Sequence, residues 1–192
     1  MKLVLSVRWV VWAAHGVGVA GAGILLWAFS FPGYAVFVAA GGLAVLGVAA
    51  LLWVVGAQLS YGSGRTWPWW LPIAPVMAVV VLALLVTGVP LRARWALSRA
   101  AFETVVAEMP ASTAATRFDR VDAPATIGGY RIISAYLVPG GVVFYEAHGA
   151  FFDDAGFAYL PGGPSPTLGN GSFESPTFRP LGGGWYRWTA SW

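Results

Sequence analysis

The sequence predicts a membrane α-helical protein with three transmembrane helices and a small all-β antiparallel domain at its C-terminal end. Hydrophobic residues make up 58% of the 192 residues and charged residues only 10%, whereas about 25% charged residues is usual in a soluble domain. No charged residue occurs in residues 9–64, a length that suits two membrane crossings of ~20 residues each. Beyond residue 116, short runs rich in β-branched and aromatic residues alternate with glycine and proline turns, which is typical of antiparallel strands.

The transmembrane region, residues 1–90, is expected to contain spans at about 9–31, 34–59 and 69–89. Pro32-Gly33 makes a turn after the first span, and the polar "SYGSGR" follows the second. A secretory signal peptide is the alternative for the first span, because "MKLVLSVR" resembles its basic start. The apolar run continues through "ILLWAF", beyond the ~7–15 residues of such a signal, and so favours a span. Tryptophans gather near the span ends, at the headgroup level that indole prefers.

The distribution of charge bears on orientation. Residues 1–110 contain six basic and two acidic residues, and residues 111–192 contain five basic and six acidic ones. Three Lys or Arg flank the spans on each side, so the positive-inside rule gives a tie. Because the basic residues of the first span precede it, we expect the N-terminus in the cytoplasm and the C-terminal domain outside, in a multi-pass plasma-membrane protein. No basic run suggests binding to nucleic acid.

An amphipathic juxtamembrane helix is predicted for residues 91–109, and a short linker for 110–116. Pro90 suits the first turn of this helix. Its apolar residues recur at helical spacing on one stripe, while most of its charged residues lie elsewhere. The stripe consists of Leu91, Trp95, Phe102, Val105 and Met109. We expect this helix to lie on the lipid surface or to extend the third span with a kink.

Residues 117–192 are expected to form four to six antiparallel strands in a meander, with a long Pro/Gly loop over 161–184. The closing "WYRWTASW" alternates with period two. Tyr186, Trp188 and Trp192 are expected to face inward, because the other face of the strand is half polar. Trp185 and Arg187 on that other face are therefore predicted to contact a ligand or partner.

Small residues in the first two spans predict close helix packing. His15 lies in the middle of the first span, where an ionisable side chain marks a pathway or ligand site, or hydrogen-bonds a neighbouring helix. The glycines that follow it favour the packing role. The partner is left open: the same chain, a second copy, or another protein. The predicted helix-packing residues are His15, Gly16, Ala20, Gly23, Ala40, Ala44 and Gly47.

Glu146 and His148 alternate on one strand face in "FYEAHG" and are the acid–base candidate, or else a partner contact on an exposed polar face. The exposed face is favoured, since no G-x-S-x-G, H-E-x-x-H or Walker motif accompanies them. Adjacent Asp153 and Asp154 are interpreted as a hairpin turn, because neighbouring strand residues point to opposite faces and rarely share a ligand. The chain has no cysteine, and neither a cofactor nor a metal site is predicted.

The "IGGYRI" opening and the "WYRWTASW" ending resemble the C-terminal domains of uncharacterised small multi-pass membrane proteins of GC-rich Gram-positive bacteria. This resemblance implies location and architecture, because no activity is assigned to those proteins. The sequence favours a non-enzymatic binding or accessory subunit, embedded in the lipid bilayer, whose β-domain meets a protein or envelope ligand. The first alternative is a subunit that packs its helices inside a larger membrane complex. A membrane-bound hydrolase-like enzyme using Glu146 and His148 comes third.

Overall fold

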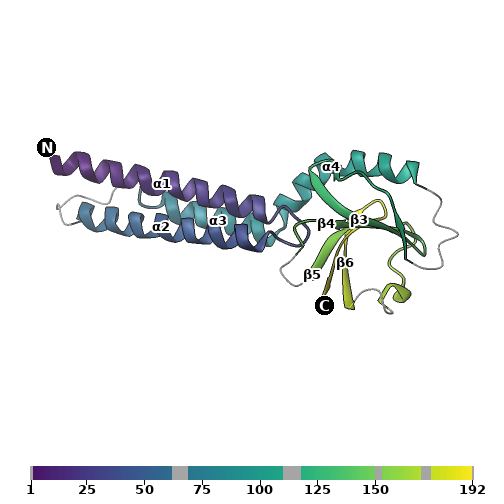
Figure 1. The fold of residues 1–192 in the computed structure, drawn as a ribbon. Coiled ribbons are helices and arrows are strands. Elements are labelled where there is room, and N and C mark those ends of the chain that lie inside the picture. Colours follow the sequence, from purple (N-terminus) through teal and green to yellow (C-terminus); the bar gives the residue numbers. More distant parts are fainter. Residues whose placement is uncertain (1, 62–68, 110–117, 150–152, 170–173, 192) are drawn as a thin grey trace. The chain divides into compact units, whose positions relative to one another are not determined.

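The computed structural model describes residues 2–61, 69–109, 118–149, 153–169 and 174–191. The chain divides into two compact units, and Figure 1 labels the four helices and four of the strands. The first, here called the helical unit, comprises Met1–Phe29 and Val36–Pro90. The second, the β unit, comprises Ser30–Ala35 and Leu91–Trp192. Six of the seven residues that join the first two helices therefore belong to the same unit as the C-terminal sheet.

Three helices form the helical unit: α1 (Lys2–Ala28), α2 (Val36–Tyr61) and α3 (Ile73–Val86). Both α1 and α2 are long and apolar enough to cross a membrane, as ~20 apolar residues are needed. A third span results if α3 and the following helix α4 (Val89–Glu108) count as one broken span. Among the described residues the protein thus has two, or up to three, helices that are long and apolar enough to span a bilayer. These helices indicate that the protein is associated with a membrane.

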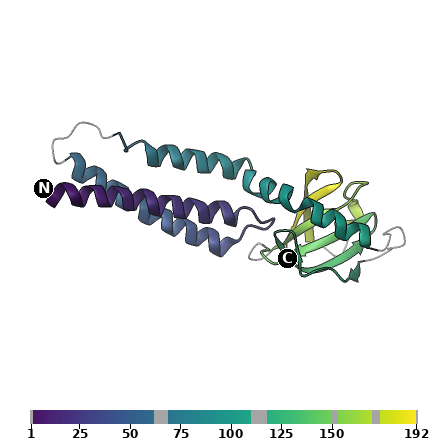
Figure 2. The same cartoon turned by 90° about the horizontal axis from the view of Figure 1, so that it is seen from above.

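The contact between α1 and α2 runs along both helices, which lie side by side in Figure 1 and Figure 2. Glycines let the two backbones approach. A Cβ added to Gly21 would stand 2.9 Å from the Leu46 side chain, and one added to Gly42 would stand 3.0 Å from Leu25. Close approach of this kind is how helices associate in lipid. The first two helices thus pack tightly on each other through Gly21 and Gly42, which were not among the predicted packing residues.

The predicted packing residues lie elsewhere on the two helices. Gly16, Ala20 and Gly23 are exposed on α1, and Ala40, Ala44 and Gly47 are exposed on α2. In the part of the chain that the structure describes, no atom outside the local helix lies within 4 Å of a Cβ added to any of the three glycines. These residues do not make the α1–α2 contact, so their packing role remains a prediction that concerns a partner.

The β unit contains one antiparallel sheet with the strand order β1-β3-β4-β5-β7-β6, and β2 pairs with β3 outside this path. The meander is broken at its end, because β7 lies between β5 and β6. The strands are β1 (Asp119–Val121), β2 (Thr126–Ile127), β3 (Tyr130–Val138), β4 (Gly141–Glu146), β5 (Asp153–Tyr159), β6 (Glu174–Gly182) and β7 (Trp185–Ser191); a short 3-10 helix, η2, spans Pro166–Gly169.

Three further expectations about the sheet are wrong. The described residues form seven strands, not four to six. Residues 174–182 of the expected long loop form the edge strand β6, which tolerates Pro176 and Pro180 because one side of an edge strand needs no hydrogen-bond partner. Asp153 and Asp154 do not form a hairpin turn but begin β5, opposite Ser191 and Ala190 of β7.

The apolar stripe of α4 packs on the sheet. The expectation that this helix lies on the lipid surface is therefore wrong. Trp95 and Phe102 are 4% and 0% exposed. The Trp95 ring stacks on Phe157 of β5, with centroids 4.6 Å apart, and lies 5.1 Å from the ring of Trp185. Val105 and Met109 at the far end of the stripe are half-buried. The sheet offers this stripe a face of aromatic side chains, and burial there removes both surfaces from water.

The opposite face of the sheet has a core of its own around Trp188, which is fully buried. The Trp188 indole N–H donates to the carbonyl of Phe144 at 3.2 Å. The inward orientation predicted for Trp188 is confirmed, and Tyr186 packs at the edge of the same core. Trp192 lies outside the described residues. Because both faces are covered, Trp185 is 1% exposed, and the expectation that it is a surface contact is wrong.

Candidate functional site

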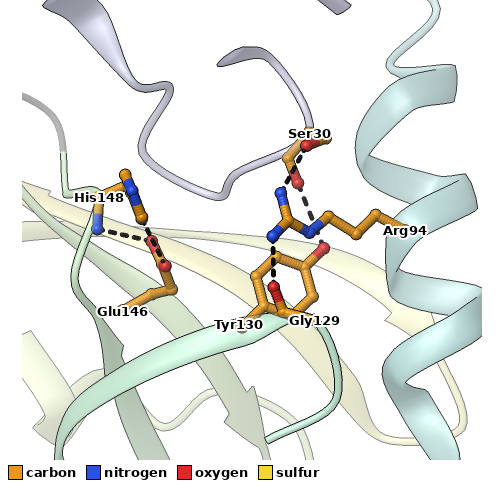
Figure 3. A network of polar contacts seen from close by, with 6 residues as sticks. All are labelled: Ser30, Arg94, Gly129, Tyr130, Glu146 and His148. Atoms are coloured by element: carbon orange, nitrogen blue, oxygen red, sulfur yellow. Dashed lines mark hydrogen bonds and ion pairs between the residues drawn. The ribbon is translucent and has the colours of Figure 1, made fainter. Parts of the chain in front are cut away.

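The segment Ser30–Ala35, which joins α1 to α2, is held against the β unit by Arg94 of α4 (Figure 3). The guanidinium Nη1 of Arg94 donates to the Ser30 hydroxyl at 2.9 Å, and Nη2 donates to the carbonyl of Gly129. The Tyr130 hydroxyl donates to the Ser30 carbonyl at 3.2 Å. We call Ser30, Phe31, Arg94, Gly129 and Tyr130 the Arg94 clamp.

Aromatic rings surround the charge in the Arg94 clamp. The Arg94 guanidinium carbon lies 4.0 Å from the centroid of the Phe31 ring and 4.8 Å from that of Tyr130. Phe31 and Tyr130 also meet edge to face at 6.3 Å. A guanidinium is attracted to ring faces at such distances, and more strongly when water is excluded. Both rings are at most 1% exposed. Arg94 thus binds the loop through two kinds of contact.

The turn between β2 and β3 is shaped to meet α4. Gly128 has φ +57°, and an added Cβ would stand only 2.6 Å from the Cβ of Ser98. The Ser98 hydroxyl donates to the Arg94 carbonyl at 2.9 Å and accepts from the Gly129 N–H at 3.0 Å. The two glycines of "IGGYRI" therefore allow the turn to touch α4, and this contact brings the Gly129 carbonyl to Arg94.

Glu146 and His148 form a hydrogen-bonded pair beside the clamp (Figure 3). Glu146, the last residue of β4, is 2% exposed and accepts from the His148 backbone N–H at 2.7 Å. Its other oxygen lies 2.9 Å from His148 Nδ1. The His148 ring stacks on Phe31, with centroids 4.1 Å apart. The two residues do come together, but the expectation of an exposed polar face is wrong for Glu146.

The electrostatics keep Tyr130 neutral. Burial raises the pKa of its hydroxyl above the ordinary value, a nearby Arg94 charge lowers it, and the Glu146 carboxylate raises it further. Since burial dominates, the hydroxyl stays protonated at physiological pH and remains a hydrogen-bond donor to the loop. It is therefore suited to holding Ser30 and unsuited to proton transfer near neutral pH.

Arg187 of β7 also faces the loop. Its guanidinium carbon lies 4.7 Å from the centroid of the Tyr34 ring. Of the four residues predicted to contact a ligand or partner, Arg187 and His148 touch this loop directly, Glu146 holds His148, and Trp185 is in the core under α4. Whether any of them binds a ligand remains a prediction.

His15 lies within α1, where its Nδ1 is 2.7 Å from the Val11 carbonyl. The ring meets Trp70 edge to face, with centroids 6.2 Å apart, whereas the buried Nε2 has no hydrogen-bond partner among the described residues. Across the described ranges no three His, Cys, Asp or Glu side chains are grouped so that they could hold a metal ion.

Sequence reasoning missed Ser30, Phe31, Arg94 and Tyr130. The loop was seen only as a turn between two spans, although "SFPGY" carries two aromatic residues. Aromatic residues near both ends of so short a loop were the available signal that the loop packs against protein. Comparison with protein-family models, with curated proteins and with solved structures finds no match to this chain.

Proposed function

We propose that the protein is a non-enzymatic, membrane-anchored binding or accessory subunit, in which the β unit is fastened to the loop between the first two membrane helices. The Arg94 clamp carries this proposal. A binding domain on a flexible tether needs no such contact. A domain that transmits a change in its conformation to the membrane helices, in contrast, needs a firm connection to the segment that joins them.

The same contact supports a three-span topology. The segment 30–35 follows the first span, and it packs in one unit with the sheet. A two-span protein would leave the sheet on the opposite side of the membrane from this segment, where the Arg94 contacts could not form. If α3 also crosses, segment 30–35 and the sheet lie on one side. With the N-terminus in the cytoplasm, that side is extracytoplasmic.

An enzyme is less well supported. The Glu146 carboxylate is buried and bonded to two groups of His148, and the His148 ring is covered on one face by Phe31. These contacts fix the loop and the end of β4. The helix-packing alternative keeps one specific observation in its favour, the exposed small residues of α1 and α2, because such faces suit association in lipid.

Topology is tested first with cysteine labelling, since the chain has no cysteine of its own. Tyr34→Cys in the loop and Ile133→Cys, at an exposed position of β3, are treated with a membrane-impermeant maleimide in intact cells. Both are expected to react without permeabilisation, whereas a cysteine introduced in residues 62–68 is expected to need it. Reaction of Tyr34→Cys and Ile133→Cys from opposite sides would refute the three-span topology.

Function is tested by co-purification of the full chain in mild detergent. A stoichiometric partner is expected to remain bound when Ala20→Leu and Ala44→Leu enlarge the exposed helix faces, because the proposal places binding on the β unit. Loss of the partner in this double variant would instead support the helix-packing alternative. If a catalytic activity were found and the double variant Glu146→Ala, His148→Ala lost it, the enzyme hypothesis would replace both the binding and the helix-packing hypotheses.

A further inference from the structure

Two arginines stand opposite each other on the last two strands of the sheet. Arg179 of the edge strand β6 is paired with Arg187 of β7 in the antiparallel register. Residues directly opposite in such a pair point to the same face, with their Cβ atoms about 4.5–5.5 Å apart. Arg179 is exposed and Arg187 is half-buried. We call these two residues the arginine pair; it places two positive charges together at the edge of the sheet.

The arginine pair has no acidic partner among the side chains that the structure describes. Asp153 of β5 and Glu174 of β6 both lie opposite Ser191 of β7. Their backbones are therefore about 13 Å along the strands from Arg187, at ~3.3 Å per residue. Asp154 is on the other face of the sheet, since neighbouring strand residues alternate. Like charges directly opposite each other are destabilising, so an anion bound between the two arginines would relieve their repulsion.

Tyr34 connects the arginine pair to the start of a membrane helix. The guanidinium carbon of Arg187 lies 4.7 Å from the centroid of the Tyr34 ring. Tyr34 is two residues before Val36, the first residue of α2, and two residues of chain span at most ~7 Å. The apolar part of α2, from Val36 to Ala57, is about 33 Å long at ~1.5 Å per residue. This length matches the ~30 Å hydrocarbon core of a bilayer.

When α2 crosses the bilayer, Val36 therefore lies at the boundary of the hydrocarbon core. The headgroup layer beyond that boundary is ~5–8 Å thick, because the whole bilayer measures ~40–45 Å. Tyr34 falls in this layer, where tyrosine is enriched in membrane proteins. The chain connection alone fixes this level, and it brings the guanidinium of Arg187 to the depth at which phospholipids carry their phosphates.

The chemistry of the arginine pair suits such a phosphate. A guanidinium binds phosphate oxygens through two parallel hydrogen bonds. The segment Ser30–Ala35 contains no charged residue, and the buried Glu146 carboxylate is already hydrogen-bonded to His148, so neither offers a competing anion. We propose that Arg179 and Arg187 together bind the headgroup phosphate of an anionic phospholipid at the end of α2 that adjoins segment 30–35.

Two cations prefer a headgroup of net negative charge to a zwitterionic one, whose own cation they repel. The proposal requires that α2 cross the membrane. It needs no protein partner, so it is independent of the proposed binding function of the β unit.

The test is native mass spectrometry of the full chain in mild detergent, with equal amounts of synthetic phosphatidylglycerol and phosphatidylcholine of different mass. Arg179→Gln and Arg187→Gln each remove one charge of the pair. Arg179→Gln is the cleaner variant, because this side chain is exposed on an edge strand. Arg120→Gln is the matched control, since Arg120 is an exposed arginine of β1, at the opposite edge of the same sheet.

The wild-type chain is expected to retain phosphatidylglycerol in preference to phosphatidylcholine. Each substitution in the arginine pair should lower the retained phosphatidylglycerol about fivefold, the contribution of one cation at an anionic membrane surface, and Arg120→Gln should leave it unchanged. Equal retention by all four proteins would overturn the proposal, as would an equal loss in Arg120→Gln. A wild-type chain that binds inorganic phosphate from the buffer but shows no preference between the two lipids would overturn it as well.

Discussion

Replacing Gly128 by alanine tests whether the β2–β3 turn depends on close contact with α4. The new Cβ would stand 2.6 Å from the Ser98 Cβ and 2.8 Å from its Cα, at a residue whose φ is +57°. The left-handed backbone costs about 1–2 kcal/mol for a residue with a Cβ, and overpacking costs about 1–3 kcal/mol. The free energy of unfolding of the β unit should therefore fall by about 2–5 kcal/mol.

Gly140→Ala is the matched control. Gly140 lies in the β3–β4 turn with φ +86°, and nothing lies within 4 Å of an added Cβ. It should cost only the backbone term of about 1–2 kcal/mol. The remaining difference of about 1–3 kcal/mol corresponds to a roughly 5- to 150-fold ratio of opening constants.

Hydrogen exchange of strand amides in the full chain, measured by mass spectrometry in detergent, reports these constants, because the slowest amides exchange only when the whole unit opens. Equal acceleration by the two substitutions would refute the reasoning, since the contact with Ser98 would then contribute nothing to the stability of the β unit.

Three further substitutions test other contacts. Arg94→Met should accelerate amide exchange in segment 30–35 by an amount equivalent to about 2–4 kcal/mol, because hydrogen bonds to a charged group are lost. Arg99→Met removes an exposed ion pair with Glu103 and a contact with Gly183 of the β6–β7 turn, and should change exchange in segment 30–35 little. Phe102→Ala should destabilise the β unit by about 3–5 kcal/mol, and Leu97→Ala, at a position 88% exposed on the same helix, by less than about 0.5 kcal/mol. Burial and, secondarily, Asp153 raise the pKa of the Asp154 carboxyl above 3.8. The charge on Asp154 therefore destabilises the folded state fully at pH values above the folded pKa, and not at all below the unfolded pKa. Asp154→Asn should raise the melting temperature at neutral pH, and this gain should vanish as the pH falls from the folded to the unfolded pKa.

The spans and the strand alternation were predictable because hydrophobic length and period-two patterning are local properties of the sequence. The expected spans at 9–31 and 34–59 correspond to α1 and α2, and Trp188 faces inward as its alternation required. The third span was not predictable in the same way, since α3 alone has 14 residues and a helix needs ~20 to cross. A count of apolar residues does not show where a helix breaks.

The clamp was not predictable from local patterns. Ser30 and Arg94 are 64 residues apart in the chain, and neither belongs to a motif with a known spacing. The pairing of Glu146 with His148 was predictable because the two residues are two positions apart in the sequence. The burial of Glu146 was not, because it depends on neighbours that are distant along the chain. Trp185 was misplaced for a related reason: a strand shows which residues share a face, not what covers that face.

Of the two alternatives for α4, the extension of the third span with a kink is compatible with the broken pair α3 and α4. The expectation that α4 lies on the lipid surface is wrong for a more specific reason, and the sequence did contain the means to avoid it. A period of 3.6 shows that a helix has an apolar face, but lipid and a sheet both satisfy that face. Ser98 lies within the stripe, between Trp95 and Phe102, and is 2% exposed. A serine has no advantage toward hydrocarbon, where large apolar side chains bury more surface. Toward a protein partner it lets a backbone approach and supplies a hydrogen bond, and the partner here is Gly128-Gly129. A small polar residue inside an apolar stripe, together with a glycine pair in a later β turn, therefore favours packing against protein over packing against lipid.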